Sequence, residues 1–163
     1  MKFIKVVVLL IAVFLITPAF AQNAPADKPA DNMEILKAKI KADKKFIVGQ
    51  NMELTESEAK NFWPVYEAYQ KDLDVLNKRV GAMIKSYADA WNTQTMNNEK
   101  AKKMVDEMLA IKADDVKLMK SYVPKLSKVL PAVKVARYLQ IENKIRAMVK
   151  YELAEGIPLV PGK

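Results

Sequence analysis

Apolar side chains recur with helical spacing through most of the chain, and the longest uninterrupted run lies in residues 56–92. Its apolar positions alternate between steps of four and three residues for four heptads, which is typical of a helix packed along its whole length. Three more apolar side chains widen this stripe along one edge. The stripe comprises Phe62, Tyr66, Tyr69, Leu73, Leu76, Val80, Met83, Tyr87 and Ala90, and its edge comprises Trp63, Ile84 and Trp91.

Local signals mark both ends of this long helix. Thr55 and Glu58 form a capping box, in which each side chain accepts a hydrogen bond from the backbone N–H of the other residue. The polar run 92–98 predicts a turn, after which heptad spacing resumes over residues 101–122. Because the turn is short, we expect the two helices to be antiparallel neighbours. Asp115 falls on the apolar seam, so either the helix rotates there or the carboxylate pairs with a lysine.

Shorter helices are expected on both sides of this pair. A weakly amphipathic first helix is predicted to end at Gly49, and a last helix to begin at Pro131 and end at Gly156. Residues 157–163 either dock as an extended strap or stay free. The last helix is expected to bury Val135, Tyr138, Leu139, Ile141, Ile145, Met148 and Val149.

Two prolines predict where the long pair bends. Pro64 and Pro124 lie at nearly equal sequence distances from residue 95 in the turn, so both helices should bend at one shared level. No segment alternates with period two for long enough to form a strand. The sequence therefore predicts an all-α fold: a long bent antiparallel helical hairpin with a short N-terminal helix and a C-terminal helix.

The N-terminus is typical of an export signal. Residues 1–21 carry Lys2 and Lys5 ahead of an apolar run, and they end in a small-residue site at Ala21. We expect cleavage after Ala21 and a periplasmic product without a stable membrane anchor. An uncleaved anchor is the alternative, but the apolar run is short of the roughly 20 residues that span a bilayer.

Composition divides the remaining chain into three parts. Residues 22–31 contain two prolines and no large apolar side chain, so we expect a disordered leader. Residues 32–156 form the predicted helical domain, and residues 157–163 form its tail. With 27 basic against 19 acidic residues in the whole chain, the protein is basic.

The absence of Cys and His from the sequence removes several function classes. No thiol nucleophile, imidazole base, disulfide or Cys/His zinc site is available. We expect no enzymatic activity, no cofactor and no metal site; Met104 and Met108 have the spacing of a soft-metal pair, but packing is the commoner role of such methionines. The lysines follow no nucleic-acid recognition motif, so we expect no nucleic-acid partner.

Binding is the remaining function class. An elongated set of helices leaves apolar surface uncovered, and here lysines surround that surface. Such a surface suits a homodimer or loosely specific contact with unfolded chains. The candidate client-binding residues lie beside the seam and near the turn, and their alternative role is core or dimer interface. They are Ile84, Trp91, Met96 and Met104.

The chain resembles the Spy/CpxP family of periplasmic chaperones and stress adaptors, whose signature is a repeated LTxxQ motif. Leu54-Thr55-Glu56-Ser57-Glu58 matches the first copy with Glu58 in place of Gln, and in the second copy, residues 130–134, only Leu130 is kept. The resemblance covers about residues 33–155. It implies a bent helical hairpin that dimerises into a curved cradle; the zinc-binding members rely on His, which this chain lacks.

Two functions follow from the resemblance. In the first, the protein is an ATP-independent periplasmic chaperone that holds partly unfolded envelope proteins on a basic, apolar helical surface. In the second, it is an adaptor that binds the periplasmic sensor domain of an envelope-stress kinase. A helical bundle without clients is a third possibility. Both functions use a positive surface, so composition does not distinguish them. Binding of several unrelated denatured proteins would indicate the chaperone, and binding of one sensor domain would indicate the adaptor.

Overall fold

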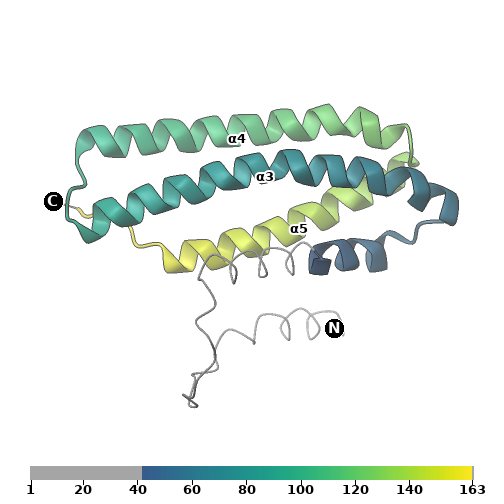
Figure 1. Ribbon diagram of the computed structural model, residues 1–163, viewed down its shortest axis with the longest axis horizontal. Coiled ribbons are helices and arrows are strands. Elements are labelled where there is room, and N and C mark those ends of the chain that lie inside the picture. The colour runs from purple at the N-terminus through teal and green to yellow at the C-terminus, as the bar shows by residue number, and fades with distance from the viewer. Residues whose placement is uncertain (1–41, 163) are drawn as a thin grey trace, which may run out of the picture. The chain divides into compact units, whose positions relative to one another are not determined.

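The computed structural model describes residues 42–162, and these residues form helices joined by short connections. Residues 42–52 are helical and precede α3 (Glu56–Asn92), α4 (Asn98–Ser127) and α5 (Ala132–Gly156). No strand occurs in this range, so the all-α prediction is confirmed for the described part of the chain. Figure 1 shows α4 lying alongside α3.

The N-terminal predictions fall outside the described residues. The signal peptide in residues 1–21, the leader in residues 22–31 and the beginning of the first helix therefore stay predictions. The residues that are described belong to one compact unit, Lys41–Lys163, which includes the C-terminal tail. All contacts given below lie within that unit.

The predicted capping box and turn are both present. Thr55 Oγ1 accepts from the Glu58 backbone N–H at 3.2 Å, and Glu58 Oε2 accepts from the Thr55 backbone N–H at 2.9 Å. The polar connection between α3 and α4 ends at Asn97, whose side chain caps α4 by accepting from the Lys100 backbone N–H at 2.9 Å. The bounds of α3 agree with the sequence prediction because local hydrogen bonds set them.

The first helix does not end at Gly49, as the sequence suggested. It continues to Met52, and the chain reverses at Glu53, which has a φ of 50°. Val48 and Met52 are completely buried, and their burial offsets the roughly 1 kcal/mol that a helical glycine costs. A Cβ at Gly49 would lie 3.6 Å from the Trp63 ring, so the helix packs closely against that ring.

Cross-helix contacts fix the direction of α4. Tyr122 donates a hydrogen bond to Asp72 at 2.6 Å, and Arg79 donates to Asp114 at 2.6 Å. Residue numbers thus rise along α3 as they fall along α4, so α4 runs back along α3. Burial, with Asp72 beside it, raises the pKa of Tyr122 to about 12, so this phenol stays a hydrogen-bond donor at neutral pH.

Both prolines lie inside helices, at levels that differ by less than one helical turn. Pro64 is within α3, and Pro124 is within α4, which continues to Ser127. The rings of Tyr69 and Tyr122 have centroids 5.2 Å apart, so Pro124 is level with that part of α3. Because the helices are antiparallel, Pro124 is level with about residue 67 of α3, which is three residues and less than one helical turn from Pro64. Side-chain contacts, rather than the midpoint of the turn, set the register of the two helices.

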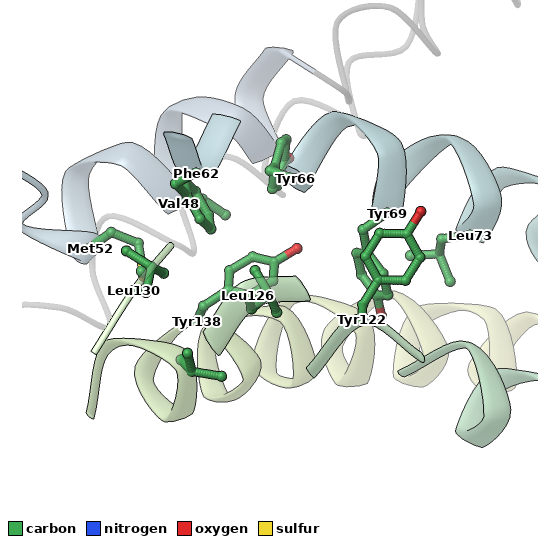
Figure 2. Packing of buried hydrophobic residues seen from close by; sticks show 11 residues of the cluster. Val48, Met52, Phe62, Tyr66, Tyr69, Leu73, Tyr122, Leu126, Leu130 and Tyr138 are labelled. Atoms are coloured by element: carbon green, nitrogen blue, oxygen red, sulfur yellow. The ribbon is translucent and has the colours of Figure 1, made fainter. Parts of the chain in front are cut away.

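The core lies where residues 42–52, the first half of α3, the end of α4 and the start of α5 meet (Figure 2). Aromatic rings fill it, with Tyr138 against Phe62 and Tyr66 at centroid distances of 5.2 and 6.0 Å. Edge-to-face pairs of this kind add about 0.5–1.5 kcal/mol each beyond the apolar area that they bury. The buried cluster comprises Val48, Met52, Phe62, Tyr66, Tyr69, Leu73, Tyr122, Leu126, Leu130, Val135 and Tyr138.

Burial is weaker in the far half of the molecule. On α3, the middle of the predicted stripe is only half-buried, and the stripe is buried again at Tyr87 and Ala90. Tyr87 donates a hydrogen bond to the backbone carbonyl of Pro158 at 2.8 Å, which attaches the tail to α3. Leu159 in the same tail is exposed. The half-buried positions are Leu76, Val80 and Met83.

The burial predicted for α5 needs two corrections. Met148 and Val149 were expected in the buried stripe, yet both are exposed. Glu142, which the sequence analysis did not place in the core, is only 1% exposed. Pro131 is the N-cap of α5 rather than its first helical residue. The apolar face of α5 is therefore covered near its start and left uncovered near its end.

Candidate functional site

The two motif copies meet at one end of the molecule. Leu130 is buried in the core, and Leu54 packs against the same cluster. The fifth residues of the two copies form an ion pair, with Lys134 Nζ 2.5 Å from Glu58 Oε2. Lys134 also donates to the Glu53 carbonyl at 2.8 Å. These contacts join the start of α5 to the start of α3, so the motif residues act in this structure as a clamp between helices.

The ion pair changes the acidity of Glu58. The Lys134 ammonium and the Thr55 backbone N–H hydrogen-bond to the carboxylate, and they lower the pKa of Glu58. The carboxylate therefore caps α3 and binds α5 at the same time. Thr55 itself is exposed and contributes only the cap.

A buried polar cluster joins three elements beside the aromatic core. Glu142 Oε1 accepts from Lys44 Nζ at 2.5 Å, and Glu142 Oε2 accepts from Gln70 Nε2 at 3.1 Å. Lys44 also donates to Gln70 Oε1 at 2.8 Å. Burial lowers the pKa of Lys44, which the neighbouring Glu142 carboxylate partly opposes. These hydrogen bonds connect Lys44 to Gln70 and Glu142, so the cluster holds residues 42–52 against α3 and α5.

Three carboxylates of α4 are paired with arginines. Asp115, which the sequence placed on the seam, pairs with Arg146 of α5 at 2.5 Å rather than with a lysine. Glu107 and Asp114 both pair with Arg79 of α3, at 2.9 and 2.6 Å. These carboxylates therefore hold helices together, and the lysines of α4 are left to set the charge of its outer surface.

The four candidate client-binding residues occupy the half of the molecule away from the aromatic core. Ile84 and Trp91 lie on α3, Met96 lies in the turn and Met104 lies on α4. All four are half-buried, and the Trp91 ring packs near Tyr87 at a centroid distance of 6.1 Å. Each residue is thus partly accessible and partly used in packing.

The sequence analysis missed the more exposed apolar side chains. Val149 and Leu153 are 51% and 42% exposed, and they continue the helix face on which Tyr138 and Glu142 are buried. They are spaced seven and eleven residues from Glu142, so they lie on the same side of α5. Helical periodicity correctly predicted that these side chains share one face of α5. The packing of α5 shows that other helices cover this face at Tyr138 and leave it exposed from Val149 onward.

Residues 42–162 contain neither an acidic metal-binding cluster nor a membrane-spanning helix. Within residues 42–162, His, Cys, Asp and Glu form no group of three or more that could hold a metal ion. No helix in the described part of the chain is long and apolar enough to cross a membrane. Met104 and Met108 are both half-buried on α4.

Comparison with known proteins found no match: no protein-family model, no curated protein sequence and no solved structure is similar to this chain. The case for its function therefore depends on the residues and contacts described above.

Proposed function

We propose that the protein is an ATP-independent periplasmic chaperone that holds partly unfolded envelope proteins on a basic, apolar helical surface. The observation that carries this proposal is the uncovered end of the inner face of α5. Val149 and Leu153 are apolar, lie on the face that elsewhere forms the core, and are about half exposed. Burying such side chains against a client contributes about 25 cal/mol per Å² of apolar area removed from water.

The position of α5 places this face opposite α3. Glu142 contacts Gln70, and further along both helices Tyr87 contacts Pro158, so α5 and the tail run in the same direction as α3. Between these two contacts, Val149 and Leu153 are level with the half-buried segment of α3 around Leu76, Val80 and Met83. The end of α5 and this segment of α3 therefore leave part of each other's apolar face exposed. Partial cover of this kind suits a client that binds briefly and in several registers.

Charge supports the same proposal. Lys144 and Lys150 on α5 and Lys78 and Lys85 on α3 are exposed beside this region. A client with acidic segments would be attracted by these lysines before apolar contact forms. Ile84, Trp91, Met96 and Met104 extend the surface toward the turn between α3 and α4.

The proposed assembly is a bent hairpin of α3 and α4 that dimerises into a cradle, as the Spy/CpxP resemblance implies. A dimer would cover apolar surface that an elongated set of helices leaves exposed. Within the described residues, much of the apolar stripe of α3 is covered by the chain itself, because six of its nine positions are buried. The proposed dimer interface therefore lies outside the covered part of this stripe.

The test is suppression of aggregation without ATP. Several unrelated denatured proteins are diluted into buffer with and without the mature chain, and light scattering is followed. We expect suppression of all of them at equimolar chaperone. The double variant V149S/L153S should lose most of this effect, whereas V133S, an exposed valine elsewhere on α5, should keep it.

Two outcomes would overturn the proposal. Equal suppression by wild type and V149S/L153S would show that Val149 and Leu153 do not bind clients. Binding to a single sensor domain, with no suppression of aggregation for any denatured protein, would favour the adaptor instead. Circular dichroism of each variant shows whether its helices are intact, so that lost activity is not confused with unfolding.

A further inference from the structure

A second apolar stripe runs along the outer flank of α4. Its side chains are Val105, Leu109, Val116 and Val123, of which Leu109 and Val116 are 54% and 53% exposed. They are four, seven and seven residues apart, so they form one continuous line on the helix. The line is rotated by about a third of a turn from the buried line through Ile111.

This stripe is independent of the surface proposed for clients. The client surface lies between α3 and the end of α5, and its one residue on α4, Met104, is about a third of a turn from the stripe. No described residue of α3 or α5 covers Leu109 or Val116, since each is more than half exposed. A stripe of this length, from residue 105 to residue 123, is about 27 Å long at 1.5 Å per residue. A partner helix of about five turns has the same length.

Lysines line the stripe. Lys112 lies within it, and Lys102 and Lys120 lie along the margin that faces away from α3; all three are exposed. Of the carboxylates beside the stripe, Asp115 is paired with Arg146, and Asp106 is a single exposed carboxylate against the three lysines. The stripe therefore combines apolar side chains at heptad spacing with a positive margin.

From this combination we infer that the outer flank of α4 binds an acidic amphipathic α-helix of another protein. The partner's apolar side chains, spaced three and four residues apart, can pack against this line of heptad-spaced side chains. Acidic residues beside the partner's seam would pair with Lys102, Lys112 and Lys120. A second copy of this chain is a poorer occupant, because it would place these lysines against one another.

The residues before the described range are a poor occupant for the same reason. Residues 22–41 contain four lysines and three acidic residues, so they supply no net negative charge. Charge complementarity therefore points to a separate, acidic partner.

The experiment uses a fluorescent synthetic peptide of 21 residues. The peptide carries Leu at positions spaced four and three residues apart, Glu beside this seam, and helix-favouring Ala and Gln elsewhere. Binding to the mature chain is measured by fluorescence anisotropy. We expect saturable binding that weakens severalfold between low and high salt, because the lysines attract the peptide. A matched peptide with Lys in place of every Glu should bind at least tenfold more weakly.

Two sets of variants locate the binding. L109S/V116S should weaken peptide binding at least tenfold, whereas V75S should change it less than twofold; Val75 is equally exposed but lies on α3. K102Q/K112Q/K120Q should weaken binding and reduce its salt dependence. The matched triple K60Q/K71Q/K128Q removes the same charge from exposed lysines elsewhere and should leave binding unchanged.

Three results would overturn the inference. They are equal binding of the acidic and basic peptides, unchanged binding by L109S/V116S, and a dimer that dissociates in L109S/V116S. The last result would show that a second copy occupies the stripe. Aggregation assays separate this inference from the proposed chaperone function, since L109S/V116S should still suppress aggregation and V149S/L153S should still bind the peptide.

Discussion

Glu58 and Lys134 lie 2.5 Å apart, although 76 residues separate them in the chain. Each is the fifth residue of one of the two LTxxQ-like segments, residues 54–58 and 130–134. Together with Leu54 and Leu130, which pack in one cluster, the pair makes the two motif copies a single contact between α3 and α5.

Charge reversal tests this contact. E58K should lower the thermal unfolding midpoint, because it removes the cap of α3 and places two ammonium groups together. K134E should also lower it, and E58K/K134E should recover part of the loss by restoring an ion pair. Calorimetry of the four proteins gives the coupling as a double-mutant cycle. Additive losses in the double variant would show that the two side chains do not interact.

The same pair predicts a pH dependence. The pKa of Glu58 is lowered in the folded protein, so its stabilising effect is present above the unfolded pKa, about 4.3, and is lost as pH falls through the folded pKa. The stability difference between wild type and E58Q should therefore be constant near neutral pH and shrink in acid. Urea unfolding between pH 2 and pH 7 measures it. A difference that grows in acid would contradict the assigned pairing.

Removing one partner of the buried cluster should be costly. E142L leaves Lys44 without its carboxylate in a buried position, and we expect a loss of about 3–5 kcal/mol. The double variant K44M/E142L should lose less, because no buried charge is left unpaired. E67Q, which breaks the exposed pair with Lys45, is the control and should change stability by less than about 1 kcal/mol. Equal losses for E142L and E67Q would mean that Glu142 is solvated.

Salt should separate the two stages of client capture. At 1 M salt the screening length falls to about 3 Å, so association of a client should slow. Release should change little, because apolar contacts hold the complex. W91S or M96S should instead speed release, with helicity unchanged. Stopped-flow and dilution measurements give both rates; if high salt removes retention as well as association, charge alone binds the client.

The export prediction is tested by intact mass. Protein exported from a Gram-negative host should begin at Gln22 and be found in the periplasmic fraction. The wild-type precursor and a variant with Ala21 replaced by Arg provide the comparison, since the variant should keep the signal. Recovery of uncleaved wild-type chain in the membrane fraction would favour the anchor.

Sedimentation tests the proposed dimer. The mature chain at micromolar concentration should sediment with twice the mass of one chain. V149S/L153S and L109S/V116S should leave this mass unchanged, because both faces are proposed to bind other proteins. A single-chain mass across the concentration range would contradict the cradle.

Local interactions determined the features that the sequence predicted correctly. The capping box, the polar turn and the heptad stripe place α3 at residues 56–92, because each feature depends on residues within a few positions of one another. The buried face of α3 also followed from periodicity, since Phe62, Tyr66 and Tyr69 lie on one side of any helix that contains them.

Only the tertiary structure decided which parts of each apolar face are covered. Glu142 is buried because Lys44, 98 residues earlier, reaches its carboxylate, and Val149 on the same face is exposed because the core ends before it. Gly49 continues a helix because Val48 and Met52 are buried on either side of it. A helical pattern determines which side chains share a face, but burial depends on elements that are distant in sequence, and their positions are set by packing rather than by local hydrogen bonds.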